Sequence, residues 1–251
     1  MALPILIFDG DKGGVGKSTA CGGFVDWALK QGLSVAVVDG DSRNPDVHRI
    51  FDVAIPVALA NLRVHDGFMD LNDFIATHED KIVVVSMPAG VGAEMKKEAP
   101  RLISMAETYD RKIALAWVMN RTLDSINLLN EAMKAYGPKL GHMIAIKNLF
   151  FGTEDKFHRW DNSETKKKFE KAGGLTVALH ELHERVMDKL FADEQNIIPY
   201  SSASVAPKDH ANSPHKLTPS EATELRIWLS DNAAVFAAIA KHIGVKADAS
   251  N

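Results

Sequence analysis

The sequence predicts an α/β fold, in which a mostly parallel β-sheet is flanked by helices on both faces. Two observations carry this prediction. Short apolar runs alternate with helix-like segments, the order that places crossover helices between parallel strands. The first apolar run also leads directly into a glycine-rich string that opens a helical pattern. The 251 residues, of which 46% are hydrophobic, are enough to build one such domain.

The strands are predicted from continuous apolar runs, because both faces of a parallel sheet are covered. These runs are 3–8, 34–38, Ile82–Ser86, Ile113–Met119, 143–147 and Leu175–Leu179. Helical patterns follow at 17–31, 69–78, 94–106, 125–136, 183–192 and 219–243. Gly32 and the pair Gly137-Pro138 end two of these helices, as glycine and proline commonly do. We expect one domain over 1–245, with a loop at 201–219 and a disordered tail at 246–251.

The charge distribution limits the kinds of partner. The formal net charge is −4, so the chain has no global basic surface for nucleic acid. A local basic cluster remains, and it is either a solvated helix face or a partner contact: Lys166, Lys167, Lys168 and Lys171.

The single cysteine, Cys21, excludes a disulfide within the chain and fits a cytoplasmic protein. We expect it to be a small buried hydrophobic residue. No apolar run approaches the roughly 20 residues of a membrane-spanning helix. The apolar face of the last helix, 219–243, is expected to pack in the core, which makes membrane contact the weaker alternative.

Residues 10–19 read GDKGGVGKST and match the phosphate-binding pattern G-x-x-x-x-G-K-[ST] at Gly16-Lys17-Ser18, with Gly10 or Asp11 near its start. Glycines let backbone N–H groups converge on a phosphate, and the next helix adds its dipole. Lys17 is predicted to reach the β- and γ-phosphates, and the Ser18 hydroxyl to bind Mg²⁺. The predicted phosphate-binding residues are Asp11, Gly13, Gly14, Val15, Gly16, Lys17, Ser18 and Thr19.

Residues 12–19, KGGVGKST, resemble the deviant Walker A motif of the ParA/MinD family of P-loop ATPases. In that family the early lysine crosses a subunit interface and contacts the phosphates bound by the partner. The resemblance therefore implies that Lys12 is catalytic together with Lys17, because both neutralise charge on the transferring phosphoryl group. It also implies a homodimer that encloses ATP.

Two further segments resemble the switch regions of the same family. In VVDGDSRNP, residues 37–45, the resemblance implies that Asp41 positions the attacking water and that Asp39 lies near the metal. The implied metal-binding residues are thus Ser18, Asp39 and Asp41. In KIVVVSMPAG, residues 81–90, Ser86 takes the place of the family's Walker B aspartate. A hydroxyl adds no charge, so we expect weak Mg²⁺ retention and slow hydrolysis, while Gly90 offers its N–H to the γ-phosphate.

The base-binding residues are predicted from the segment after the strand Ile113–Met119. Asn120-Arg121 resembles the Asn-Arg of adenine-binding relatives and departs from the Asn-Lys-x-Asp of guanine readers. A second loop should flank the base. Two segments are candidates, 180–181 and 198–200, and the sequence does not choose between them.

These patterns favour an ATP-driven switch in plasmid or chromosome partition, or in conjugative DNA handling, with DNA or a DNA-bound protein as partner. Residues 147–152, KNLFFG, together with Trp160, resemble plasmid ParA-like proteins of the StbB/TraL type. Two alternatives stay open. One is a metabolic phosphoryl-transfer or ligase enzyme similar to dethiobiotin synthetase. The other is a nearly inactive nucleotide-binding scaffold, which Ser86 suggests.

Overall fold

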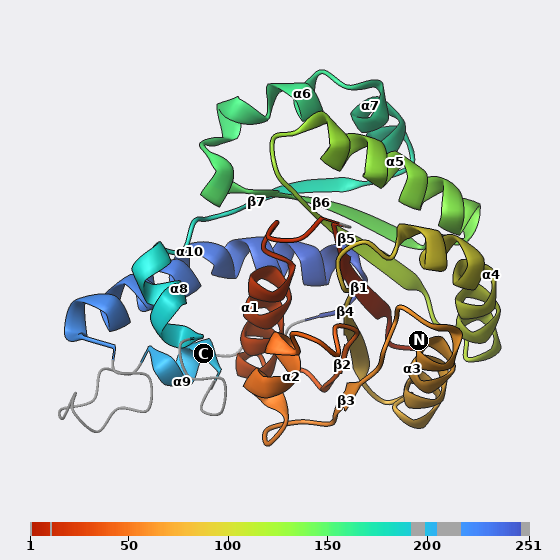
Figure 1. Ribbon diagram of the computed structural model, residues 1–251, viewed down its shortest axis with the longest axis horizontal. Helices are drawn as coiled ribbons and strands as arrows, with labels where there is room; N and C mark the ends of the chain where they lie inside the picture. Colours follow the sequence, from red (N-terminus) through yellow and green to blue (C-terminus); the bar gives the residue numbers. More distant parts are fainter. Residues whose placement is uncertain (1, 11, 192–198, 205–216, 247–251) are drawn as a thin grey trace.

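Seven strands form the central sheet of the computed structural model, which describes residues 2–10, 12–191, 199–204 and 217–246 (Figure 1). Every strand pair in this sheet is parallel. The spatial order β3-β2-β4-β1-β5-β6-β7 places β1 in the interior, between β4 and β5. The strands are β1 (Ile5–Asp9), β2 (Val35–Asp39), β3 (Val57–Leu59), β4 (Ile82–Ser86), β5 (Ile113–Met119), β6 (His142–Asn148) and β7 (Leu175–Leu179). This architecture confirms the α/β prediction.

Helices cover both faces of the sheet (Figure 1). The first face is covered by α1 (Lys17–Lys30), α2 (Asp46–Phe51), α8 (Glu184–Leu190), α9 (Tyr200–Ala203) and α10 (Pro219–His242). The second face is covered by α3 (His65–Thr77), α4 (Gly92–Thr108), α5 (Leu123–Tyr136), α6 (His158–Asp161) and α7 (Glu164–Lys171). Short 3₁₀ helices are η1 (Gly137–Lys139), η2 (Leu149–Phe151) and η3 (Glu154–Phe157).

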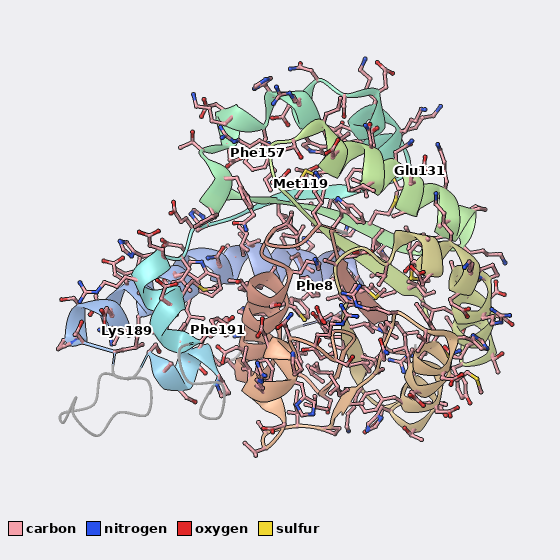
Figure 2. All side chains as sticks on the ribbon, in the orientation of Figure 1. Phe8, Met119, Glu131, Phe157, Lys189 and Phe191 are labelled. Atoms are coloured by element: carbon pink, nitrogen blue, oxygen red, sulfur yellow. The ribbon has the colours of Figure 1, made fainter. Side chains whose placement is uncertain are left out.

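The side chains of β1 show why the strand sequences are apolar throughout. Leu6 and Phe8 belong to the core on the first face, whereas Ile5 and Ile7 belong to the core on the second. All four are fully buried, because successive strand residues point to opposite faces and both faces are covered. Phe8 lies near α1 (Figure 2). Its ring contacts that of Phe24 in α1 at a centroid distance of 5.9 Å.

The last helix, α10, packs in the core, as predicted. Leu225, Trp228, Phe236 and Ile239 of this helix are buried on the first face of the sheet. Thr218 and Glu221 form a capping box that satisfies the first backbone N–H groups of the helix. None of the described helices is long and apolar enough to cross a membrane.

The structure differs from the predicted elements where segments are short. The sequence did not indicate β3 and α2, which have three and six residues. Helix α3 begins at His65 rather than at residue 69. Helix α9 reaches into the predicted loop at 201–219, of which 205–216 lie outside the described residues. Of the predicted tail, 247–251 also lie outside them.

The basic cluster lies on α7, where carboxylates neutralise part of it. The Nζ of Lys166 lies 2.9 Å from Oδ1 of Asp161, and that of Lys167 lies 2.7 Å from Oε1 of Glu164. On the inner side of the same helix, Phe169 is fully buried. This pairing favours a solvated helix face over a nucleic-acid contact.

Candidate nucleotide-binding site

The predicted phosphate-binding loop joins β1 to α1 at the carboxyl end of the sheet. Gly14 (φ 72°) and Gly16 (φ 93°) both adopt the left-handed backbone region, which favours glycine. Gly16 is also the N-cap of α1, so the free N–H groups of this helix begin at the loop. At Gly10, a Cβ atom would lie 2.5 Å from the carbonyl oxygen of Val118, so a side chain does not fit there. The predicted Asp11 lies outside the described residues.

A cavity of about 520 Å³ opens beside this loop. Six of the predicted loop residues line it: Gly13, Gly14, Gly16, Lys17, Ser18 and Thr19. The side chain of Val15 is instead buried in the core. The Nζ of Lys17 donates a hydrogen bond of 2.8 Å to the backbone oxygen of Lys12. Lys17 thus folds back over the loop, in the space where a phosphate chain would be cradled.

Lys12, the residue on which the family resemblance depends, contacts its own chain in this structure. Its Nζ lies 2.6 Å from Oδ2 of Asp124, in the first turn of α5. The Lys12 side chain is 34% exposed and that of Asp124 is 67% exposed. An ion pair this open to solvent is weak, so it can exchange for another partner.

Both carboxylate oxygens of Asp39, at the end of β2, accept hydrogen bonds from backbone N–H groups. Its Oδ2 accepts from the N–H groups of Val47 (2.9 Å) and His48 (3.1 Å), at the start of α2, and its Oδ1 accepts from that of Asp41 (3.1 Å). The residue is only 2% exposed. Burial raises the pKa of its carboxyl from 3.8 to about 6, against the opposing effect of these three hydrogen bonds.

Asp41 and Arg63 form a second group of charges on the cavity wall. The Nη2 of Arg63 lies 3.9 Å from Oδ2 of Asp41, and its Nη1 donates to the carbonyl oxygen of Ala89 at 2.8 Å. Oδ1 of Asp41 accepts from the backbone N–H groups of Arg43 and Asn44. Arg63 lies in the loop between β3 and α3 and belongs to no motif, so no signal in the sequence indicated it.

Ser86 occupies the expected place of a Walker B residue at the end of β4. It is in register with Phe8 of β1 on one side and with Asp39 of β2 on the other. Ser86 is buried, and it lines the cavity. Strand β4 therefore lies between β2 and β1, the strand that leads into the loop. Asp39 and Ser86 both line the cavity.

The described side chains fit a magnesium ion poorly. Mg²⁺ prefers oxygen ligands, commonly including one or two carboxylates, in near-octahedral geometry. Of the three predicted ligands, Asp39 is held by backbone N–H groups and Asp41 lies beside Arg63, which leaves the Ser18 hydroxyl. The described residues contain no group of three or more His, Cys, Asp or Glu side chains that could hold a metal.

The predicted base-binding pair does not line the cavities beside the loop. Oδ1 of Asn120 accepts from both the backbone N–H and the hydroxyl of Thr122, at 2.9 and 2.7 Å, and the carbonyl of Arg121 accepts from Arg159. Neither Asn120 nor Arg121 is among the residues that line the cavities bordering Gly14 and Gly16. These two residues as base readers stay a prediction.

Asn148, at the end of β6, lies directly beside the loop instead. Its Nδ2 donates to the carbonyl oxygen of Val15 at 2.9 Å, and a Cβ atom on Gly16 would overlap the same nitrogen. A cavity of about 220 Å³ there is lined by Asn148, Gly16, Leu179 and His180. Of the two candidate loops, this geometry favours 180–181, because His180 lines the cavity. The sequence carries no local signal for Asn148, which the order of the strands brings to the loop.

The other candidate base loop lies away from this cavity. Tyr200 is buried, and its ring contacts that of Trp228 in α10 at a centroid distance of 5.7 Å. Residue 198 lies outside the described residues. The buried position of Tyr200 makes it part of the core.

Gly90 follows β4 with φ 72°, again in the left-handed region. It borders a separate cavity of about 290 Å³ between α4 and α5, which Met95, Trp117 and Leu128 also line. The indole Nε1 of Trp117 donates to the carbonyl oxygen of Ser125 at 3.0 Å.

Cys21, as predicted, is buried, and burial raises the pKa of its thiol.

Comparison with solved structures finds distant likenesses. A nucleotide-binding protein of Archaeoglobus fulgidus in complex with ADP is 13% identical, with a TM-score of 0.42 over 70% of this chain and 79% of that one. Cell division protein FtsY of Thermotoga maritima is 14% identical, with a TM-score of 0.46 over 88% and 68%. Chloroplast FtsY of Physcomitrella patens is 17% identical, with a TM-score of 0.43 over 58% and 50%. These likenesses are too low to support an argument about function.

Comparison at the level of sequence is more specific. No family model matches the chain. Protein MobD of Acidithiobacillus ferrooxidans is 32% identical to it over 197 residues, which are 78% of this chain and 86% of MobD. Such identity over most of both chains shows that this chain belongs to the MobD family.

Proposed function

We propose that this protein is a cytoplasmic ATP-binding switch of the ParA/MinD type, which dimerises around ATP and hydrolyses it slowly. The observation that carries the proposal is the loop itself. Gly14 and Gly16 hold the left-handed backbone of a phosphate cradle, and Lys17 and Ser18 line its 520 Å³ cavity at the start of α1. This combination suits binding of a nucleotide's phosphates.

Adenine recognition is assigned to Asn148 and the loop at 180–181. The amide of Asn148 donates one N–H to Val15 and accepts at Oδ1 from the N–H of Phe150, and its second N–H and second lone pair remain for a base edge. Its hydrogen bond to the Val15 carbonyl ties the base side of the site to the phosphate loop. Asn120, the earlier candidate, directs its side-chain oxygen to Thr122.

Dimerisation is supported by apolar side chains at the carboxyl edge of the sheet. Leu59 (43% exposed), Val64 (47%), Leu123 (58%) and Phe150 (51%) all lie at or just after the ends of strands β3, β5 and β6. These side chains are spread along the carboxyl end of the sheet, from β3 to β6, and exposed apolar side chains at one end of a sheet favour a protein interface. A second copy fits, because Lys12 lies on the same edge and can exchange Asp124 for the partner's phosphate.

The direct test is the size of the full chain without nucleotide, with ADP and with ATP, by light scattering after size exclusion. We expect ATP alone to produce a dimer of the wild type. Lys12→Ala should bind ATP and remain monomeric, whereas Lys17→Ala should lose ATP binding by about a hundredfold or more. Dimers of wild type and Lys12→Ala in equal amounts, or of neither, would contradict the proposal.

Ser86 favours a second candidate, a scaffold with almost no hydrolysis. The buried hydroxyl replaces a carboxylate at the position that the register places between Asp39 and β1. Steady-state ATPase of wild type and Ser86→Asp separates the two functions. A slow but measurable wild-type rate supports the switch, whereas ATP-dependent dimers that persist without turnover support the scaffold. A wild type faster than Ser86→Asp would contradict the role given to Ser86.

The partner in DNA handling is proposed from the ParA-like resemblance, with DNA or a DNA-bound protein as the candidate. Stimulation of the ATPase by DNA or by such a protein would support partition or conjugative handling of DNA. Turnover that requires a small carboxylate or amine substrate would instead support a metabolic enzyme.

A further inference from the structure

One arginine side chain joins the two segments that flank the predicted terminal phosphate. Arg63 donates from Nη1 to the carbonyl oxygen of Ala89, directly before Gly90, and its Nη2 faces Asp41. Its side chain is 30% exposed and lines the same cavity as Lys17. Both contacts are ones that a phosphate oxygen can replace, because a guanidinium binds phosphates through paired N–H groups.

The charges on the cavity wall are balanced without a metal ion. Three cations and three carboxylates line the cavity: Lys17, Arg43 and Arg63, and Asp39, Asp41 and Asp46. An aspartate at position 86 would add a fourth carboxylate at the buried end of β4. Because Ser86 stands there, the wall carries one negative charge fewer than the family pattern would give it.

The three carboxylates of this wall already have partners. Asp39 accepts three backbone hydrogen bonds and holds the start of α2. Asp41 lies against the guanidinium group of Arg63, and Asp46 lies 3.8 Å from that of Arg49. Both guanidinium groups therefore compete with a cation for the carboxylate oxygens. Magnesium binds to nucleotide sites through one or two carboxylates and the phosphates, and here it meets this competition at each carboxylate.

We propose that Arg63 supplies in cis the positive charge that magnesium supplies in other P-loop proteins. The chain then binds a nucleoside triphosphate with little dependence on divalent metal, and Arg63 distinguishes the triphosphate from the diphosphate. This inference rests on the proposed nucleotide binding. Its consequence is that arrival of the γ-phosphate draws Arg63 away from Ala89 and Asp41, which couples both switch segments to the nucleotide.

The test is equilibrium binding of fluorescent ATP and ADP analogues to the full chain, with Mg²⁺ and with EDTA. For the wild type, we expect the ATP affinity to change less than about threefold when EDTA replaces Mg²⁺. Arg63→Gln should lose about tenfold or more in ATP affinity in EDTA and less than about threefold in ADP affinity. Arg63→Lys, which keeps the charge but not the paired N–H groups, should lie between.

Two further variants sharpen the test. Arg101→Gln removes an arginine from the exposed side of α4, where it pairs with Glu98, and should bind like the wild type. Ser86→Asp adds the missing carboxylate, and its ATP affinity should rise about tenfold or more when Mg²⁺ is present. Thermal unfolding without nucleotide shows whether each variant folds; if Arg63→Gln does not, Arg63→Lys and Ser86→Asp decide the question.

The outcomes separate this inference from the proposed function. A wild type that binds ATP with Mg²⁺ but loses about tenfold or more in EDTA overturns the inference and leaves nucleotide binding intact. Equal ATP binding by Arg63→Gln and wild type in EDTA overturns the role of Arg63. A wild type that binds no nucleotide in either buffer overturns the proposed function itself.

Discussion

Two arginines at opposite ends of the sheet show how differently the same side chain is used. Arg111, at the amino end, is buried and donates to the carbonyl oxygens of five residues: Leu3, Pro4, Ile75, His78 and Lys81. Arg63, at the carboxyl end, is partly exposed and has two contacts around a cavity. The amino end thus uses its arginine for stability, whereas the carboxyl end keeps one available for a ligand.

The largest expected effect is at Arg111, at the amino end of the sheet. Arg111→Met should lower the free energy of unfolding by about 3–5 kcal/mol, because the buried carbonyl groups lose their donors. Chemical denaturation followed by circular dichroism measures this loss. Lys97→Met, on the exposed side of α4, is the control and should change stability by less than about 0.5 kcal/mol. Equal losses in the two variants would remove the contrast between the ends.

The second effect concerns the buried carboxylate of Asp39, at the carboxyl end of the sheet. The folded-state pKa of Asp39, about 6, lies above its ordinary 3.8, so between these values the folded chain holds a proton that the unfolded chain has released. Stability from this group is therefore highest below about pH 4 and falls by roughly 3 kcal/mol in all as the pH rises through 6.

Asp39→Asn should remove that dependence. The readout is the difference between the stability slopes of wild type and variant from pH 4 to pH 6, the interval between the two pKa values. The absolute stability of the variant also changes, because Asn offers an N–H where Asp41 N–H needs an acceptor. Parallel slopes in both proteins would show that Asp39 titrates normally despite its burial.

A smaller effect is expected at Asn148. Asn148→Ala removes the hydrogen bond to Val15 and the proposed base contact, so ATP affinity should fall about tenfold. Asn120→Ala, measured in the same assay, tests the competing assignment. A larger loss for Asn120→Ala than for Asn148→Ala would restore the first prediction of base recognition.

The smallest effect is expected at Asp124. Asp124→Ala frees Lys12 from an exposed ion pair, so ATP-dependent dimerisation should strengthen by about twofold or less. Light scattering over a range of protein concentrations measures the midpoint. Weakened dimerisation would indicate that Asp124 holds Lys12 in its productive position.

The interior strands were predictable from sequence because burial on both faces leaves continuous apolar runs. Strand β3 left no such run, because its three residues lie at the edge of the sheet and none is buried. Helix α2 was missed for another reason. The Asp39 side chain, from a different element, accepts hydrogen bonds from its first N–H groups, so the sequence has no local capping residue that would indicate the start of a helix.

The candidate phosphate loop could be recognised in the sequence because its pattern is local: glycines, a lysine and a hydroxyl lie within ten residues. Arg63 and Asn148 could not, because tertiary structure alone brings them to the loop. Arg63 depends on the position of β3, and Asn148 on β6 lying two strands from β1. A motif search sees neither dependence.

The indole of Trp117, beside Gly90, gives the protein an internal optical reporter. Its ring borders the 290 Å³ cavity that Gly90 closes, while its Nε1 is fixed by the Ser125 carbonyl. Displacement of Gly90 would alter the polarity around a ring that itself stays in place. Replacing Trp27, Trp160 and Trp228 by phenylalanine would therefore leave an emission wavelength that follows this backbone segment in real time.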